Sequence, residues 1–557
     1  MITILRSIAC PRRGIQTAWA VAVCLCLLCA WAGVANAIPA HMWSHRYAQP
    51  DGQWFEKVAV DPSGNIVVCG NFYASLSLGQ VYTSAGFEDG FVAKFSASGN
   101  LLWVHQLGDV RPDRMMDIAV DLAGNVIVSG HMSSNINDAD AVVAKYAPDG
   151  TLSWLKRFGT NDFHFQSAMV VATNASNEII IAGEFDGDFS VGGSTLQPTG
   201  GITFFMAKLD ENGNHVWSER FATTTPYSYN LDGLGTLPDG HIVLCGQLID
   251  SVDFGNGALS VNGQSDIFLA RFDTDGTATW SQRYGDAGVQ QATDIAINDA
   301  GDIAMVGFTN GAIDFGGGEL MAGADFDPFA AVLTASGNYV WSKIYKGASN
   351  QYPGSLAWAY NQDLLVVWRG SGVLNFGGAD LSIVGPESGL WLTRFSGESG
   401  AHRWSTTLTS STNMNAQIQQ FENRIILAGG VGGTVNFGAG QTTGEADYYD
   451  LFLVKFRDIS TSVKTTEFTQ LGQNVPNPFN PTTVIPYNLA ASAHVRISIY
   501  AASGALVTSL DEGVQPAGTH VVTWNGRNAR GQAVASGVYF YRLEGSADAP
   551  RKMVLLK

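Results

Sequence analysis

The sequence has few charged residues and a shortage of positive charge. Charged residues make up 14% of the 557 residues, against about 25% in an average soluble protein. Lysine and arginine together (31) are outnumbered by aspartate and glutamate (49), which gives a net charge of −18. A chain this acidic repels the phosphate backbone of nucleic acids, so we expect no nucleic-acid partner.

Cysteine is nearly absent beyond the first 37 residues. Of the six cysteines, only Cys69 and Cys245 lie after that point. Both follow an apolar pair and precede a glycine, at the same position of two separate sequence repeats. Equivalent positions of separate repeats face different neighbours. We therefore expect two small buried apolar residues, with no disulfide and no metal pair.

Apolar residues and glycine, by contrast, are abundant. Hydrophobic residues make up 46% of the chain, which contains 64 Gly, 29 Phe, 17 Tyr and 14 Trp. This apolar content provides a large core and excludes wholesale disorder. Short β-prone runs separated by glycine-rich turns predict an all-β fold without long helices.

Residues 1–37 have the pattern of a secretory signal peptide. Arg6, Arg12 and Arg13 precede an apolar run over about 17–34, and Ala35-Asn36-Ala37 provides a small-residue cleavage site. A membrane anchor is the alternative, because the apolar run is nearly long enough to span a bilayer. We expect cleavage, no stable membrane span afterwards, and a secreted or outer cell-surface protein.

A repeat of about 60 residues dominates residues 38–457. A glycine stands four residues before a tryptophan six times, with successive tryptophans 51 to 63 residues apart: Gly99/Trp103, Gly150/Trp154, Gly213/Trp217, Gly276/Trp280, Gly337/Trp341 and Gly400/Trp404. Four β-prone segments recur in the same order in each unit, which is typical of a propeller blade. The sequence predicts a seven-bladed β-propeller.

The order of the segments also predicts how the ring closes. The chain begins with a tryptophan strand at 43–47 and ends with the preceding strand type at 451–456, so the two ends should share one blade. This pairing would cover two sheet edges. The first strand of each unit should be innermost, and its recurring small residues fit the crowded axis: Ala59, Ala119, Ala172, Gly235, Ala296 and Ala357, with Ile418 in the seventh unit.

On these motifs the region Trp43 to Phe456 resembles the bacterial secreted propeller repeats called SBBP-type. The Gly-x-x-x-Trp turn is similar to the tryptophan-docking motif of quinoprotein propellers, and this resemblance implies that the motif packs neighbouring blades. Quinoprotein dehydrogenases also have an adjacent cysteine pair and eight blades, and this sequence has neither. We expect no cofactor.

The last part of the chain reads as a separate small domain. Residues 458–470 are polar and predict a linker, and 471–557 contain alternating strands and turns that predict a small Ig-like β-sandwich. Pro476 to Thr483, Trp524-Asn525-Gly526 and the terminal residues 552–557 resemble the Ig-like fold of FlgD-type proteins and the C-terminal sorting domains of type IX secretion substrates. That resemblance implies engagement of a secretion machinery. A purely structural module is the alternative.

Motifs for common catalytic and metal sites are missing. The sequence has no His-Glu-x-x-His, Gly-x-Ser-x-Gly or phosphate-binding loop pattern. Asp253 and Asp314 occupy equivalent hairpin positions, where a turn-forming role is expected. Residues 135–140 and 273–276 carry clustered oxygen ligands that suit calcium. Solvated turns are the favoured interpretation of both, and we expect no metal site.

Residues that differ between repeats are the candidates for ligand binding. Three of the four extra propeller tryptophans lie in the sixth unit, and loops from an outermost strand to the next innermost strand share one face. Aromatic and polar side chains at a ring mouth suit a glycan or peptide. The candidate ligand-binding residues are Arg114, His164, Tyr229, Tyr352, Trp358 and Trp368. Tryptophans packed in the core are the alternative for the last two.

The sequence therefore predicts an exported, non-catalytic binding or scaffold protein that recognises an extracellular glycan or protein. An enzyme that acts on extracellular glycans, a lyase or hydrolase, is the alternative, because fold does not determine function. That alternative requires non-repeated acids with a histidine or tyrosine at one mouth of the channel.

Overall fold

The computed structural model describes residues 39–557 with gaps at 48–51, 136–137, 160–163, 200, 224–229, 324, 384–388, 439, 444–448, 459–467, 490–492, 502–504, 516–517 and 544–549. The signal-peptide prediction, most of the predicted linker, and Tyr229 lie outside these residues. In the described parts of the chain every assigned element is a β-strand, and no helix long and apolar enough to cross a membrane is found there.

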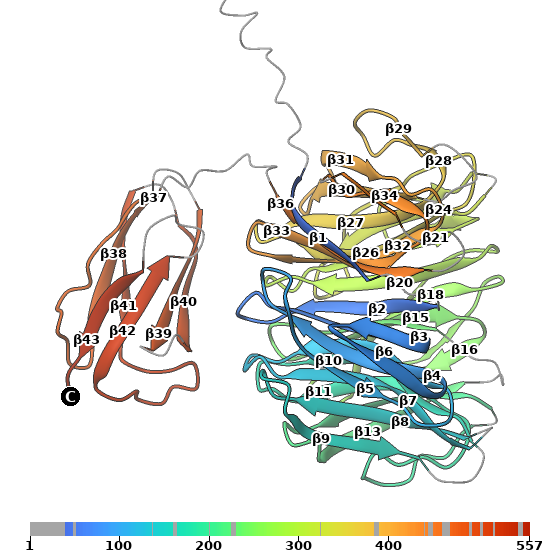
Figure 1. Cartoon of the computed structure of the whole chain (residues 1–557), viewed down its shortest axis with the longest axis horizontal. Coiled ribbons are helices and arrows are strands. Elements are labelled where there is room, and N and C mark those ends of the chain that lie inside the picture. Colours follow the sequence, from blue (N-terminus) through green and yellow to red (C-terminus); the bar gives the residue numbers. More distant parts are fainter. Residues whose placement is uncertain are drawn as a thin grey trace, which may run out of the picture. The chain divides into compact units, whose positions relative to one another are not determined.

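Four-stranded antiparallel sheets make up the region before the linker (Figure 1). The described residues form seven of them, each with its strands in order from the first to the fourth: β2(Gln53–Val60), β3(Ile66–Leu78), β4(Gln80–Phe95), β5(Leu101–Leu107); β6(Asp113–Val120), β7(Val126–Asn135), β8(Asp138–Tyr146), β9(Leu152–Phe158); β10(Gln166–Thr173), β11(Ile179–Phe185), β12(Thr203–Leu209), β13(His215–Thr223); β14(Leu231–Thr236), β15(Ile242–Leu248), β18(Asp266–Phe272), β19(Ala278–Tyr284); β20(Gln290–Ile297), β21(Ile303–Thr309), β24(Asp327–Leu333), β25(Tyr339–Ile344); β26(Gln351–Trp358), β27(Asp363–Gly370), β30(Gly389–Ser396), β31(His402–Leu408); and β32(Met414–Phe421), β33(Arg424–Val431), β36(Asp450–Arg457), β1(Ala40–Tyr47). Four short hairpins accompany the sheets: β16(Ser251–Asp253) with β17(Ala258–Ser260), β22(Ala312–Ile313) with β23(Leu320–Met321), β28(Gly372–Leu374) with β29(Leu381–Ile383), and β34(Thr434–Asn436) with β35(Gln441–Thr443). The first hairpin pairs with β13 and extends the third sheet to six strands, and the other three form two-stranded sheets of their own.

The first strands of the sheets form a closed ring, which makes the fold a β-propeller. β2, β6, β10, β14, β20, β26 and β32 each contact the next, and β32 contacts β2. The two ends of the repeat region meet in one sheet, where β1 pairs with β36 and Trp43 lies opposite Lys455 (Figure 1). The predicted shared sheet is confirmed, as is the predicted order with the first strand inside and the tryptophan strand outside.

The tryptophans of the outer strands join each sheet to the next. The Trp103 indole lies against Gly150, whose added Cβ would come 2.7 Å from the ring, and Trp103 Nε1 donates to the Pro148 carbonyl at 3.2 Å. Trp154 and Trp217 make the same contacts with Gly213 and Gly276. Only glycine, with a positive φ, lets the backbone approach the indole this closely. The docking role implied by the motif is confirmed.

Buried ion pairs recur between the third strand and the first turn of a sheet. Lys145 Nζ lies 3.0 Å from Asp121 Oδ2 and donates to the Glu211 carbonyl of the next unit at 3.2 Å. Lys94 and Asp61 form the same pair at 2.9 Å. In the fifth sheet the equivalent positions hold Val332 and Asn298. Neither residue is charged, so this sheet lacks both members of the ion pair.

The small residues expected on the inner strands lie opposite the second strand as predicted in the first six sheets, but the assignment of Ile418 is wrong. Six inner strands contain a β-bulge near their start, for example between Phe55 and Lys57. Strand β32 pairs without a bulge, so the residue at the equivalent position is Gln419, opposite Ile426. Ile418 is fully buried instead.

The C-terminal strands form a separate sandwich. One sheet has the order β37(Phe468–Leu471), β38(Thr483–Leu489), β41(Gly518–Trp524). The other has the order β40(Leu506–Gln515), β39(Ala493–Ala501), β42(Gly537–Leu543), β43(Arg551–Leu555). Trp524, Tyr541 and Ile497 lie in its core. Cys69 and Cys245, in the propeller, are both fully buried and free, as predicted.

Candidate functional site

The bulge of the inner strands places one equivalent side chain of each sheet on the channel. A bulge inserts one extra residue, so it shifts which residues face inward. The residues directly after the bulge, together with their counterpart on β32, are Lys57, Asp117, Val170, Gly233, Asp294, Ser355 and Gln417. Their chemistry differs in nearly every sheet, so the blade fold does not require it.

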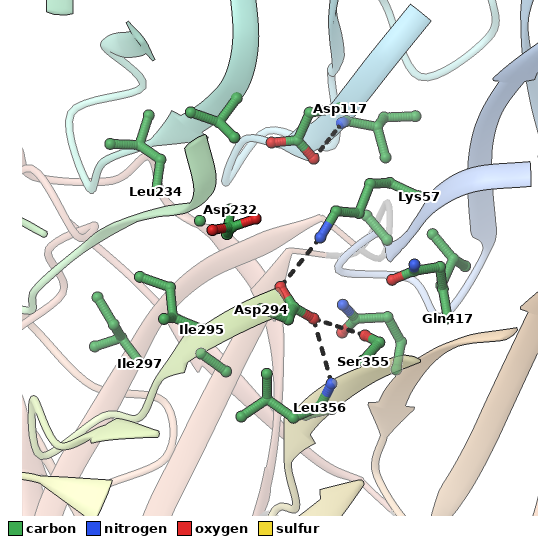
Figure 2. A pocket seen from close by; sticks show the side chains of 18 of the residues that line it. Lys57, Asp117, Asp232, Leu234, Asp294, Ile295, Ile297, Ser355, Leu356 and Gln417 are labelled. Carbon is green, nitrogen blue, oxygen red and sulfur yellow. Dashed lines mark hydrogen bonds and ion pairs between the residues drawn. The ribbon is translucent and has the colours of Figure 1, made fainter. Parts of the chain in front are cut away.

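Charged groups gather in the resulting channel cavity, which has a volume of about 310 Å³. Lys57 Nζ donates to Asp294 Oδ1 at 3.1 Å, and Asp294 Oδ2 accepts from Ser355 Oγ at 2.7 Å and from the Leu356 amide at 3.2 Å (Figure 2). Burial lowers the pKa of Lys57, but Asp294 and Asp117 outweigh it and raise that pKa overall. The lysine is therefore charged.

Two further aspartates face the same cavity. Asp117 accepts from the Ile118 and Val171 amides, both at 2.8 Å, yet burial raises its pKa to about 6. Asp232 stands at the bulge of β14, and burial raises its pKa well above the ordinary value, although Gln291 bonds to it. Among the described residues, Asp232 Oδ2 has no hydrogen-bond partner. One lysine thus faces three carboxyl groups.

A second cavity, of about 480 Å³, lies at the starts of the inner strands β6 and β10, beside strands β3 and β4 of the first sheet. We call it the mouth pocket; it is lined by Tyr73, Phe87, Glu88, Pro112, Arg114, Met116, His131, Phe165, Ser167, Met169 and Glu184. Arg114 Nε lies 2.9 Å from Glu88 Oε1, and the arginine side chain is 47% exposed. Phe87 is 66% exposed and packs edge-on against Tyr73.

The acids and the histidine of the mouth pocket are largely withdrawn from solvent. Glu88 and Glu184 are each 1% exposed. Burial, with a contribution from Arg114, lowers the pKa of His131 to about 4, so its ring is neutral at pH 7. The groups left for a ligand in the same lining are the Arg114 guanidinium, Phe87 and Phe165.

One of the predicted binding residues belongs to the lining of this pocket, and a second is next in sequence to a lining residue. Arg114 lines it, and His164 adjoins the lining residue Phe165 and lies with Nδ1 3.2 Å from Asp186. Tyr352 belongs to the sixth sheet, where it packs on Phe308 with the Arg369 guanidinium 5.5 Å from its ring.

The two tryptophans of the sixth sheet have different roles. Trp358 lines the channel cavity and donates from Nε1 to the Ala296 carbonyl at 3.0 Å. Trp368 is fully buried and donates to Thr393 Oγ1 at 2.8 Å. Its prediction as a ligand-binding residue is wrong, because its ring packs against Tyr345 and Phe376 in the core.

Sequence reasoning missed the charges in the channel. Lys57, Asp117, Asp232 and Asp294 are separated by about one repeat or more, and an alignment of the inner strands that allowed for the bulge would have placed them together. The turn role expected for Asp253 and Asp314 is confirmed. Asp253 accepts from the amides of Gly255 and Gly257, and Asp314 does the same in its own hairpin.

The closed ring and the sandwich together define a β-propeller protein with a C-terminal Ig-like domain. Residues 480–548 match the FlgD Ig-like domain family. The chain is 24% identical over 328 residues to an uncharacterized WD repeat-containing protein, L264, of Acanthamoeba polyphaga mimivirus; the match covers 43% of this chain and 23% of that protein. The chain thus spans less than a quarter of that relative's length.

The chain also has a distant similarity to solved structures. Quinohemoprotein alcohol dehydrogenase from Comamonas testosteroni is 10% identical, with a TM-score of 0.39 and 79% of each chain covered. The structure of YCF48 bound to D1 peptide is 10% identical, with a TM-score of 0.36, and covers 77% of this chain and 99% of that one. At these values the similarity concerns only the general architecture.

Proposed function

We propose that the protein is an exported, non-catalytic binding protein whose seven-bladed propeller holds an extracellular glycan or protein ligand in the mouth pocket. The C-terminal Ig-like domain is the sorting signal that a type IX-like secretion machinery recognises. The resulting location is the outer cell surface or the medium.

The composition of the mouth pocket is the observation that carries this proposal. Its accessible groups are the Arg114 guanidinium, Phe87 and Phe165, whereas Glu88 and Glu184 are buried. A cation and exposed aromatic rings in one lining provide polar recognition and apolar contact area without a reactive group. These residues come from three sheets and break the repeat, which is expected of a ligand site and not of a blade contact.

A second candidate is an enzyme that acts on extracellular glycans. It is favoured by one feature of the same pocket, in which the non-repeated acids Glu88 and Glu184 adjoin His131. Glycoside hydrolysis uses a pair of carboxyl groups on either side of the bond that is cleaved. Binding is the stronger candidate because both acids are shielded and Glu88 is engaged by Arg114.

The binding function is tested with the mature chain, residues 38–557, on a glycan array and on a panel of immobilised extracellular peptides. We expect a hit whose affinity falls about tenfold or more in Phe165→Ala and in Arg114→Ala. Tyr360→Ala is the matched control, since it removes an exposed aromatic ring from a first turn at the other end of the inner strands. Equal binding by all variants would refute the mouth pocket, and turnover of the hit would establish the enzyme.

The delivery role is tested separately in cells. Deletion from Pro476 onward removes most of the Ig-like domain, after which the cells are fractionated and the propeller is detected in each fraction. We expect it to accumulate inside the envelope. Unchanged delivery to the surface would refute the sorting role and leave the binding proposal untouched.

A further inference from the structure

The channel cavity contains an incomplete set of ionic partners. Four inner strands, β2, β6, β14 and β20, contribute Lys57, Asp117, Asp232 and Asp294 to it (Figure 2). Asp294 has three hydrogen-bond donors and Asp117 has two backbone amides. Both carboxylates are therefore satisfied within the protein.

Asp232 is the exception among these groups. Its Oδ2 is buried and finds no donor in the described part of the chain, and the residue lines a cavity of about 310 Å³. A buried carboxyl group with one oxygen left unbonded is costly in its charged form unless a proton or a cation joins it. Burial indeed raises its pKa, against the effect of Lys57.

The other lining residues indicate the kind of cation. Leu234, Ile295 and Ile297 provide an apolar wall beside Asp232 (Figure 2). Within the described residues, no three His, Cys, Asp or Glu side chains are arranged to hold a metal ion. A cation with N–H donors and a short hydrocarbon part matches a carboxylate next to such a wall, because each part then meets a complementary surface.

We propose that the channel cavity is a binding site for a small alkylammonium ion, whose ammonium group is held by Asp232 and whose carbon chain lies along Leu234, Ile295 and Ile297. The site is separate from the mouth pocket and does not depend on the function proposed for it. Cation binding favours the charged form of Asp232 and so lowers the pKa of that carboxyl group, which burial raises in the free protein.

The test uses n-butylammonium as the probe and isothermal titration calorimetry on the mature chain, with n-butanol and tetramethylammonium as comparison ligands. We expect n-butylammonium to bind about tenfold or more tightly than either, because n-butanol lacks the charge and tetramethylammonium lacks N–H donors. Equal or absent binding of n-butylammonium would overturn the proposal.

Two variants locate the site. Asp232→Asn keeps the shape and removes the charge, so we expect an affinity loss of about tenfold or more. Asp253→Asn, in an exposed hairpin turn, is the matched control and should bind as the wild type does. Leu234→Trp fills the cavity, keeps Asp232, and should also abolish binding. Leu234→Trp tests the same site if Asp232→Asn does not fold. Unchanged binding of n-butylammonium by either folded variant would overturn the proposed site.

Proton release provides a readout that mere occupancy would not give. Titrations in two buffers with different ionisation enthalpies report the number of protons released on binding. The titratable groups facing Asp232 are Lys57, Asp117, Asp294 and Cys245. We expect the wild type and Asp253→Asn to release protons on binding when they are titrated at a pH at which the free carboxyl group is protonated. Wild-type binding without proton release would contradict the role of Asp232.

Discussion

Lys57 Nζ lies 3.1 Å from Asp294 Oδ1, although the two residues are 237 positions apart in the chain. Lys57 belongs to β2 and Asp294 to β20, strands that are not neighbours in the ring of inner strands. The ion pair therefore bridges the channel and joins the first sheet to the fifth. A propeller has few contacts of this kind, since its sheets otherwise meet only their neighbours.

Replacing Lys57 by Met should destabilise the propeller. Asp294 loses its cation, and three buried carboxyl groups remain in one cavity. Breaking a buried pair costs about 3 kcal/mol, and we expect a loss of this order in the free energy of unfolding from urea titrations at pH 7. The double variant with Asp294→Asn should recover part of the loss. Equal stability of Lys57→Met and the wild type would show that the pair contributes nothing.

The pH dependence of stability should reveal Asp117. Its folded pKa is about 6, above the ordinary value of about 3.9. The folded state therefore binds more protons than the unfolded state between these values, and stability falls as the pH rises from about 4 to about 6. Asp117→Asn removes this contribution and should raise the urea midpoint at pH 7 relative to that at pH 4.

Asp113 adds a second contribution to the pH dependence of stability. Burial raises its pKa to about 6 as well, so Asp117→Asn should keep a reduced slope, and Asp113→Asn should reduce it by a separate amount. Urea midpoints at pH 4, 5, 6 and 7 for both variants check this. An unchanged slope in Asp117→Asn would contradict the raised pKa of the buried Asp117.

The sequence predicts the ring and its closure because the docking contact repeats. Gly150 and Trp103 belong to consecutive units, and the same spacing recurs about every 60 residues, so one motif describes many interfaces. The repeat spacing does not predict which side chains face the channel. A single bulge residue changes which side chains face inward, and β32, which lacks it, places Gln419 where the sequence pattern suggested Ile418.

The candidate site was predictable only in part, for a related reason. The sequence singles out Arg114, which lines the mouth pocket, because it lies in a loop-proximal position that differs from its counterparts. Trp368 was misassigned because a large aromatic residue in place of a recurring glycine looks exceptional, whereas the sheet around it accommodates the ring in the core beside Phe376. Side-chain direction depends on the local pairing, which spacing alone does not specify.

The ion pair of Lys145 with Asp121 should be replaceable as a unit. Lys145→Val leaves the Asp121 carboxylate buried without its cation and should cost about 3 kcal/mol in the free energy of unfolding. Lys145→Val combined with Asp121→Asn reproduces the arrangement of Val332 and Asn298 in the fifth sheet, and should lie within about 1 kcal/mol of the wild type. A double variant as unstable as the single one would refute this equivalence.

The docking of β1 can be tested at Gly99. Gly99 has φ of +86°, and an added Cβ would come 2.7 Å from His45 Nε2 and 3.0 Å from the Trp43 ring. Gly255 has φ of +103° with nothing within 4 Å of the added atom, so it serves as a control for backbone strain alone. Each alanine substitution should cost about 1 kcal/mol from the positive φ. Gly99→Ala should cost about 1 kcal/mol more, because the ring contacts must loosen.

Urea unfolding of the two alanine variants separates strain from docking, since only Gly99 touches the strand that closes the ring. Loosened β1 would also expose the edge of β36, an edge that pairs readily with another chain. We therefore expect Gly99→Ala to show concentration-dependent association by light scattering, while Gly255→Ala remains unchanged. Equal losses of stability and equal scattering in the two variants would mean that the Trp43 strand does not depend on this contact.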